Sequence, residues 1–257
     1  MATQSISNDA ALDIFEELDA GAIALLLDVD GTLIDIGPSP KDVHVADELR
    51  DTLARLFRAT DGALALVSGR PVADLDALFA PLKLPAVGGH GAELRLRAGE
   101  AATLAAPLPA DLRRKLAEAA TPGSGILVED KGYSLALHYR QAPQHEDRVR
   151  SHIAAGRAAY PAEATEVLPG KAMLEVKRPN VSKGEGVRDL MRRPPFAGRV
   201  PVFIGDDVTD ESVFAVLTEM GGRGFSVGRH FAGLAGIFSS PNDVRGALQR
   251  LAAKDRS

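Results

Sequence analysis

Short apolar runs alternate with helical repeats along the first third of the chain. Unbroken apolar runs over 22–27 and 63–67 predict strands at 22–28 and 63–67 that are buried on both faces, as in a parallel sheet. Apolar positions at helical spacing predict three helices here, over 9–18, 44–58 and from Pro71 to about Phe79. With a short strand at 85–87, this βαβαβ order predicts a doubly wound parallel sheet, an α/β fold with a Rossmann-like core.

The pattern changes after about Pro107. Helix patterns over 110–120 and 144–160 each precede two strand-like runs, so the order becomes αββαββ. The four strands are expected at 126–130, 133–139, 165–168 and 172–177, with tight turns at Lys131-Gly132 and Pro169-Gly170. An order of this kind predicts a separate, smaller antiparallel α+β unit.

The alternating pattern returns after Val181. A helix over 183–192, a strand over 201–204 and a helix over 209–219 lead to short strands at 224–227 and 236–239 and a last helix over 241–253. The sheet therefore draws on both ends of the chain. We expect a core made of 1–107 and 180–257, with 108–179 inserted as a second domain.

Bulk properties narrow the class of protein. The 257 residues are 45 % apolar, carry a net charge of −5 without long charge runs, and include no cysteine. These features argue against a nucleic-acid partner, a disulfide framework and a thiolate metal site. The first twenty residues lack the order of a signal peptide, and no apolar stretch is long enough to span a bilayer. We expect a soluble, cytoplasmic monomer that does not bind membranes.

Two acidic clusters carry the candidate chemistry. Asp28 ends the strand at 22–28 and Asp30 lies two residues on, and Asp206, Asp207 and Asp210 follow the strand at 201–204. Both clusters fall at the carboxyl ends of buried strands, where parallel sheets bind ligands. Carboxylates gathered there repel one another unless a cation lies between them, and Mg²⁺ is the oxygen-seeking ion that suits such a site.

The first cluster predicts a nucleophile. Asp28 can attack phosphorus to form an acyl phosphate, and Asp30 can protonate the leaving alcohol and later deprotonate the attacking water. The alternative is a turn in which aspartate and Gly31 supply only turn geometry. The preceding apolar strand and the following Thr32-Leu33 favour the catalytic interpretation.

Three further positions fit the same pocket. Ser68 ends the second strand and can hold a phosphoryl oxygen, although a helix-capping serine has the same appearance. Lys183 begins a helix, where its charge opposes the helix dipole, so we expect it to screen Asp28. Asp206 is best placed to bind the metal, with Asp207 or Asp210 orienting it or Lys183 from behind. Arg70 is compatible with a phosphate contact and with a surface position.

These motifs, in this order, resemble the haloacid-dehalogenase superfamily of phosphatases. The resemblance rests on Asp28-Val29-Asp30-Gly31-Thr32, Ser68, Lys183 and Gly205-Asp206-Asp207 with Asp210. It implies that Mg²⁺ is held by the Asp28 side chain, the Asp30 backbone carbonyl and the Asp206 carboxylate. It also implies that the inserted domain is a cap that closes over the substrate.

Motifs in the insert, and one shortly before it, narrow the resemblance to the trehalose-6-phosphate phosphatase family. They are Gly89-His90-Gly91-Ala92-Glu93, Glu129-Asp130-Lys131-Gly132-Tyr133, His138-Tyr139-Arg140, Gly170-Lys171 and Leu174-Glu175-Val176. Glu129 and Lys131 share a face of an extended strand, and so do Lys171 and Glu175. We expect five cap residues to bind sugar hydroxyls: Glu129, Lys131, Arg140, Lys171 and Glu175. His90 is either a further substrate contact or a loop residue.

The sequence therefore predicts a Mg²⁺-dependent phosphatase that converts trehalose 6-phosphate to trehalose and phosphate through an aspartyl-phosphate. Two alternatives remain at this point. One is a phosphatase for another sugar phosphate, of the sucrose phosphate or mannosylglycerate phosphate type. The other is a catalytically silent sensor of sugar phosphates.

Overall fold

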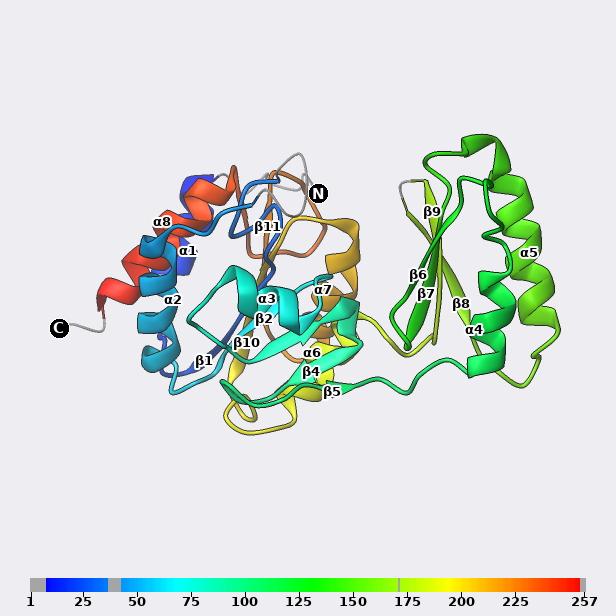
Figure 1. Cartoon of the computed structure of the whole chain (residues 1–257). Helices are drawn as coiled ribbons and strands as arrows, with labels where there is room; N and C mark the ends of the chain where they lie inside the picture. Colours follow the sequence, from blue (N-terminus) through cyan, green and yellow to red (C-terminus); the bar gives the residue numbers. More distant parts are fainter. Residues whose placement is uncertain (1–7, 37–42, 171, 255–257) are drawn as a thin grey trace. The chain divides into compact units, whose positions relative to one another are not determined.

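The computed structural model describes residues 8–36, 43–170 and 172–254. The chain divides into two compact units, one formed by the residues up to Thr103 together with those from Ser182 onward, the other by Leu104–Val181 (Figure 1). The first is called the core unit below and the second the cap unit.

The core unit is built on an eight-stranded sheet with the order β12-β11-β10-β1-β2-β3-β4-β5. Its six strands from β12 to β3 are parallel, as the α/β pattern predicted. The strands are β1 (Ile23–Leu27), β2 (Leu64–Val67), β3 (Ala86–Gly88), β4 (Glu93–Arg95), β5 (Thr103–Leu104), β10 (Val200–Gly205), β11 (Arg223–Val227) and β12 (Gly236–Phe238).

The sequence analysis missed β4 and β5. Strand β4 pairs with β3 in antiparallel fashion, and β5 lies beyond it at the edge of the sheet. Both are too short to produce an apolar run, and β5 is exposed at both of its residues. These strands are set by pairing, β4 with β3 and β5 with β4, and not by local hydrophobicity.

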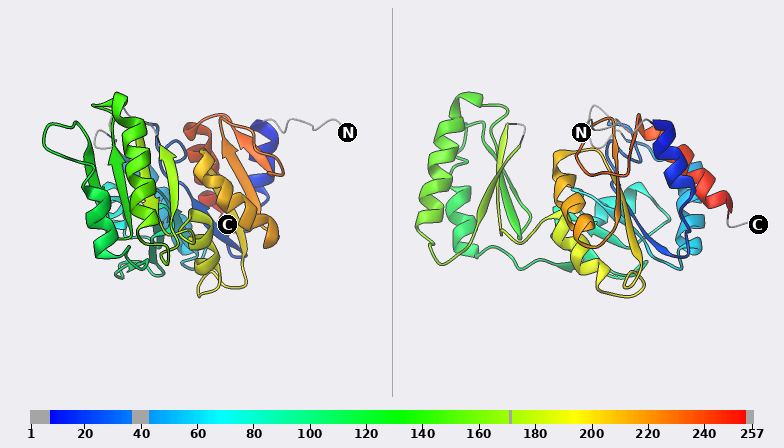
Figure 2. Two further views of the ribbon diagram at one scale, coloured as in Figure 1. Left: turned by 90° about the vertical axis from the view of Figure 1, so that its right-hand side faces the viewer. Right: turned by 180° about the vertical axis from the view of Figure 1, so that it is seen from behind.

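Helices cover both faces of the core sheet (Figure 2). Alternate residues of β1 point to opposite faces: Leu25 and Leu27 belong to one apolar cluster and Ala24 and Leu26 to the other. The first cluster includes residues of α1 (Asn8–Glu16), α2 (Asp47–Ala59), α3 (Val72–Leu78) and α8 (Pro241–Lys254). The second includes residues of α6 (Lys183–Met191) and α7 (Glu211–Glu219).

The order of the parallel strands reverses between β1 and β10. From β1 the chain continues outward through β2 and β3, and from β10 it continues outward in the other direction through β11 and β12. In doubly wound sheets the ligand site lies at the carboxyl ends of the strands beside such a switch point. The fold therefore directs attention to the residues that follow Leu27 and Gly205.

The cap unit has a four-stranded antiparallel sheet with the order β6-β7-β9-β8. Residues of α4 and α5 pack with Leu135, Leu137 and Val176 into one apolar cluster, so the helices cover one face of this sheet. The elements are α4 (Ala110–Ala117), β6 (Leu127–Asp130), β7 (Ser134–His138), α5 (Glu146–Ala158), β8 (Glu166–Gly170) and β9 (Met173–Lys177).

One turn in the cap unit was predicted wrongly. Pro169 and Gly170 were expected to join two strands, but both belong to β8, where they pair with Leu174 and Met173. Proline is tolerated there because β8 is an edge strand. Ala172, directly before β9, takes a positive φ of 56°.

None of the helices in the described ranges 8–36, 43–170 and 172–254 combines the length and the apolar character needed to cross a membrane.

Candidate active site

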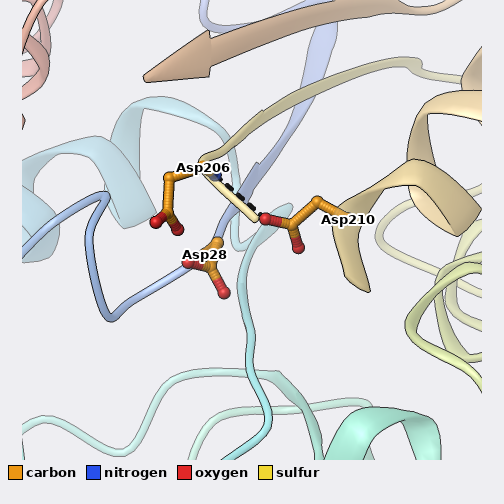
Figure 3. A group of neighbouring side chains, drawn as sticks. All are labelled: Asp28, Asp206 and Asp210. Carbon is orange, nitrogen blue, oxygen red and sulfur yellow. Dashed lines mark hydrogen bonds between the residues drawn. The ribbon is translucent and has the colours of Figure 1, made fainter. Parts of the chain in front are cut away.

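Asp28 and Asp206 lie at the carboxyl ends of neighbouring strands. Asp28 directly follows β1, and its backbone N–H donates to the carbonyl of Ile204 in β10 at 2.9 Å. Asp206 directly follows β10, and its side chain approaches that of Asp28 (Figure 3). The switch point of the sheet thus brings the two acidic motifs together, although they are far apart in the sequence.

A tight turn after β1 makes room for Asp206. Gly31 has a φ of +81°, and its N–H donates to the carbonyl of Ile34 at 2.8 Å. A Cβ at position 31 would stand 2.6 Å from Cγ of Asp206. Glycine is therefore required twice, for the left-handed backbone and for the close approach of the carboxylate.

Asp210 organises the loop after β10 from the interior. Its Oδ2 accepts from the backbone N–H groups of Asp206 and Asp207, both at 3.0 Å, and its side chain is fully buried. Asp207 is exposed and caps the short 3₁₀ turn Val208–Asp210 by accepting from the N–H of Val208. The two residues predicted to act from behind Asp206 therefore differ: Asp210 orients the loop directly, and Asp207 shapes the turn that carries Asp210.

Lys183 links the two acidic motifs. Its Nζ donates to Oδ1 of Asp28 and to Oδ1 of Asp210, both at 2.7 Å, and only 4 % of its side chain is exposed. Ser182 caps the helix that begins at Lys183 by accepting from the N–H of Glu185. Burial alone would lower the pKa of Lys183, but Asp28 and Asp210 outweigh it and raise that pKa. The ammonium therefore stays charged at the end of β1.

The carboxylates outnumber the cation. Oxygens of Asp28, Asp206 and Asp210 lie within 4.8 Å of one another, and Lys183 is the ammonium that contacts this cluster. Burial raises the pKa of Asp28 well above its ordinary value, and Lys183 offsets this only in part. The pKa of Asp206 is raised as well, by burial and by the charge of Asp210. Such an excess of buried negative charge is expected where a cation belongs.

The donor set fits a hard divalent ion. Both oxygens of Asp210 are already engaged, by Lys183 and by two backbone N–H groups, so this residue has little left to offer a metal. One oxygen of Asp28 accepts from Lys183, and the carboxylate of Asp206 occupies the space where a side chain at Gly31 would lie. Two facing carboxylates beside a backbone turn are a typical oxygen set for Mg²⁺, which binds through few protein ligands and keeps several waters.

Ser68, Arg70 and His90 meet on the neighbouring strand ends. Ser68 follows β2, is buried, and accepts from the N–H of Arg70 at 3.1 Å. The His90 ring lies over Gly69, where a Cβ would stand 2.5 Å from Nε2. His90 thus packs against the loop of Ser68 and itself takes a positive φ of 55°.

Arg70 has a partner that the sequence did not reveal. Its Nε donates to Oδ2 of Asp30 at 2.7 Å, and its Nη2 donates to Oδ1 at 2.6 Å. The side chain of Arg70 is only 14 % exposed, so it is not a simple surface arginine. No periodic pattern connects two residues that are forty positions apart, and only the adjacency of β1 and β2 brings them together.

In the cap unit, three of the predicted residues form a cluster on the sheet. Glu129, Ala136 and Glu175 are register neighbours across β6, β7 and β9. Nζ of Lys131 lies 3.5 Å from Oε1 of Glu129 and 3.9 Å from Oε1 of Glu175. The face opposite the cap helices therefore carries a connected charged group.

Two residues of this cluster were not predicted. Nε2 of His138 lies 3.1 Å from Oε2 of Glu129, and Oγ of Ser134 donates to Oε1 of Glu175 at 2.6 Å. Partial burial alone would raise the pKa of Glu129, but Lys131 and His138 outweigh it and lower that pKa. Strand parity was the available signal, since Ser134 and His138 alternate with the apolar Leu135 and Leu137.

The other two predicted cap residues stand apart from this cluster. Arg140 is exposed, in the turn that follows β7. Lys171 lies outside the described residues.

The sequence of this chain is similar to those of known phosphatases. The sequence profile of the trehalose-phosphatase family matches residues 26–232, which include both acidic motifs and the whole cap unit. The trehalose-6-phosphate phosphatase of Escherichia coli is 39 % identical over 243 residues, covering 91 % of each chain. A probable trehalose-phosphate phosphatase of Sinorhizobium fredii is 36 % identical over 233 residues, covering 89 % of this chain and 87 % of its relative.

Solved structures support the same fold. The C-terminal domain of the trehalose-6-phosphate phosphatase of C. albicans superposes with a TM-score of 0.74 over 98 % of both chains, at 23 % identity. The parallel core sheet and the separate antiparallel sheet are thus those of haloacid-dehalogenase-like trehalose phosphatases, as the sequence motifs predicted. The chain belongs to the trehalose-phosphatase family of phosphoric monoester hydrolases.

Proposed function

We propose that this chain hydrolyses trehalose 6-phosphate to trehalose and phosphate in a Mg²⁺-dependent reaction through an aspartyl-phosphate on Asp28. The observation that carries the proposal is the placement of Asp28 at the switch point of the sheet, with Lys183 on Oδ1 and Asp206 opposite. Lys183 leaves Oδ2 of Asp28 as the oxygen for attack on phosphorus.

Each core residue has a role in the proposed reaction. Asp28 attacks phosphorus while Asp30 gives a proton to the departing sugar oxygen, and Asp30 then removes a proton from the attacking water. Lys183 and Ser68 hold the phosphoryl oxygens, since both are buried beside Asp28 or on the next strand end. Asp210 keeps Lys183 and the Asp206 loop in place.

The carboxylates of Asp28 and Asp206 and the backbone carbonyl of Asp30 would hold the ion. When bound, Mg²⁺ supplies charge neutralisation for the phosphate beside the carboxylates. The close fit of Gly31 against Asp206 supports this assignment, because it lets the second carboxylate reach the first.

Specificity is assigned to the cap unit. Glu129, Lys131 and Glu175 form a polar surface of the kind that bonds to the hydroxyls of a disaccharide, and His138 and Ser134 extend it. We include Arg140, Lys171 and His90 as further substrate contacts, on the strength of the family motifs. A site of this kind rejects ligands that leave its buried polar groups unpaired.

Two alternatives are weighed against this proposal. A phosphatase for sucrose phosphate or mannosylglycerate phosphate would use the same core, so only the cap residues favour trehalose 6-phosphate. A silent sensor would not need the buried Lys183–Asp28 pair, whose ammonium and carboxylate are both costly to bury. That pair favours catalysis.

A phosphate-release panel tests the proposal. Purified protein is assayed with trehalose 6-phosphate, sucrose 6-phosphate, mannosylglycerate phosphate and glucose 6-phosphate, each with Mg²⁺ and with a chelator. The proposal requires that kcat/KM with Mg²⁺ be highest for trehalose 6-phosphate. A higher value for another sugar phosphate would overturn the substrate, and no release from any substrate would favour the sensor.

A further inference from the structure

Arg70 and Asp30 form a fork-to-fork ion pair at the carboxyl edge of the core sheet. Two N–H groups of one guanidinium edge donate to the two oxygens of one carboxylate, at 2.7 Å and 2.6 Å. Bidentate pairs of this type fix the orientation of the carboxylate as well as its charge. The side chain of Arg70 is 14 % exposed and that of Asp30 is 40 % exposed, so Arg70 is the more deeply buried partner.

The backbone of both partners is also anchored. The N–H of Arg70 donates to Oγ of Ser68, and its carbonyl accepts from the N–H of Gly89 at 2.9 Å. Asp30 pairs with Ile34 in an isolated bridge across the turn at Gly31. The fork therefore joins two fixed points, and neither side chain needs to be ordered by substrate.

The pair holds Asp30 outside the acidic cluster. Among the described residues, the carboxylates that gather within 4.8 Å are those of Asp28, Asp206 and Asp210, and Asp30 is not among them. A carboxylate offers about four lone pairs, of which the fork uses two. Asp30 therefore keeps free lone pairs while its plane is fixed by Arg70.

We propose that Arg70 is a positioning residue that holds Asp30 as an oriented base for the second half of the reaction. The inference rests on the proposed aspartyl-phosphate mechanism. The fork takes one lone pair of each Asp30 oxygen and fixes the plane of the carboxylate, so the remaining lone pairs keep one direction for accepting a proton from water. Arg70 therefore assists the step in which Asp30 acts as a base.

In the step concerned, Asp30 takes a proton from a water molecule as the water oxygen bonds to phosphorus. The bond between phosphorus and the Asp28 oxygen breaks, and its electron pair returns to the Asp28 carboxylate. Inorganic phosphate leaves, and Asp30 keeps the proton. That proton is the one donated to the leaving alcohol in the next turnover, so the cycle balances.

A direct phosphate contact explains the geometry less well. Nε and Nη2 are the edge that an arginine uses for bidentate binding of an oxyanion, and both already donate to Asp30. Binding a phosphate through that edge would break two charge-assisted hydrogen bonds. The structure thus assigns Arg70 to Asp30 in preference to the substrate.

The test is rapid-quench kinetics with p-nitrophenyl phosphate and Mg²⁺. Its phenolate leaves without a proton donor, so formation of the phospho-enzyme depends little on Asp30 and its hydrolysis depends on it strongly. Arg70→Ala is expected to give a burst of nitrophenolate equal to the enzyme concentration, then a steady rate lowered roughly tenfold or more. Arg70→Lys keeps the charge without the fork and is expected to show the same burst. Added guanidinium ion is expected to restore the steady rate of Arg70→Ala.

Asp30→Asn supplies the reference. If Arg70 acts through Asp30, the double variant Arg70→Ala with Asp30→Asn turns over no more slowly than Asp30→Asn alone. Guanidinium ion should not rescue either of these two proteins. Arg188→Ala is the matched control, because Arg188 is also a partly buried arginine, paired with Glu219 at 2.6 Å, and lies on α6. It should show no burst and an unchanged rate.

Several outcomes would overturn the inference. Equal slowing of phospho-enzyme formation and hydrolysis in Arg70→Ala would mean that Arg70 serves the substrate or the fold. The same conclusion would follow if the double variant turned over more slowly than Asp30→Asn by the factor that Arg70→Ala alone loses. If Asp30→Asn accumulates a phospho-enzyme and Arg70→Ala and Arg70→Lys do not, the inference fails and the mechanism stands. If no variant accumulates one, the aspartyl-phosphate mechanism itself fails.

Discussion

Gly31 and Asp206 lie so close that a Cβ on Gly31 would stand 2.6 Å from Cγ of the aspartate. The two residues belong to different motifs at the ends of adjacent strands, β1 and β10. Their contact sets how near the carboxylate of Asp206 comes to that of Asp28. The glycine of the first motif is thus part of the candidate metal site, although it contributes no ligand atom.

The first prediction is that Gly31→Ala disables the site. Alanine must adopt a φ near +81° and also displace the Asp206 carboxylate. We expect kcat/KM to fall roughly a hundredfold or more, with weaker Mg²⁺ dependence of the melting temperature. The left-handed backbone adds a stability cost of about 1–2 kcal/mol.

Gly99→Ala separates the two effects. Gly99 has a similar φ of +76°, and nothing lies within 4 Å of the position of its added Cβ. This control should lose similar stability and keep its activity. Equal activity losses in both variants would show that backbone strain, and not displacement of Asp206, is responsible.

A second prediction concerns Asp28 and pH. Since burial raises the pKa of Asp28 in the folded chain above its unfolded value of 3.8, the folded state binds this proton more tightly. That contribution to stability is fully present below the unfolded pKa and is lost as the pH rises through the folded pKa. Metal-free protein should therefore lose stability as the pH rises above about 4.

Asp28→Asn removes the buried carboxylate whose ionisation lowers the stability at high pH, and it also removes the nucleophile. In the metal-free state its melting temperature should exceed that of the wild type at about pH 8, and the difference should shrink toward pH 4. Turnover should fall by roughly three orders of magnitude or more. Asp189→Asn, at an exposed ion pair on α6, is the control and should change neither quantity. A metal-free Asp28→Asn that is less stable than wild type at pH 8 would contradict the argument.

A third prediction concerns the metal itself. Three clustered carboxylates and one ammonium leave two negative charges in excess, which a divalent cation neutralises. Chelation should reduce activity by roughly a hundredfold or more, and Mg²⁺ should restore it. Saturating Mg²⁺ should also raise the melting temperature, by an amount equivalent to about 2–3 kcal/mol at a hundred times the dissociation constant.

Asp206→Asn tests where the ion binds. It removes one proposed ligand and should abolish the stabilisation by Mg²⁺ as well as the activity. Ca²⁺ should stabilise the wild type but support little turnover, because it takes more ligands at longer distances. Full activity in metal-free protein would rule out the metal requirement.

The sequence predicted those parts of the fold that produce strong periodic patterns. The parallel strands β1 and β2 are unbroken apolar runs, as are residues 202–204 of β10, and the helices of both units repeat apolar residues at helical spacing. Two acidic residues of the candidate site could also be predicted, because Asp28 and Asp206 directly follow such runs. Strands β4 and β5 were missed because they are short and are defined by pairing, β4 with β3 and β5 with β4.

Contacts between distant segments account for what the sequence did not predict. The sequence around Arg70 gives no indication that it pairs with Asp30, because the pairing depends on the adjacency of β1 and β2. His138 lies opposite Leu127 in the register, and its contact with Glu129 depends on that register and on side-chain direction. Strand parity can place such a residue on a face, but only the structure can name its partner.

The last prediction separates the cap unit from the core. The cluster of Glu129, Lys131 and Glu175 is proposed to meet the sugar, while the core residues meet the phosphoryl group that all substrates share. Removing one sugar contact leaves its partners unpaired, at a cost of about 1–3 kcal/mol. Single alanine variants at these three positions, and at Arg140, should therefore lower kcat/KM for trehalose 6-phosphate roughly tenfold or more. Hydrolysis of p-nitrophenyl phosphate should change far less.

His138 extends this test to a residue that only the structure identified. His138→Ala removes a contact to Glu129 and should give the same selective loss, in a weaker form. Lys115→Ala is the matched control, because Lys115 lies in α4 of the cap unit and its ion pair with Glu118 is largely exposed. It should leave the hydrolysis of both substrates unchanged. Equal losses on both substrates in the cluster variants would mean that these residues stabilise the cap fold, and the choice of trehalose 6-phosphate would lose its physical basis.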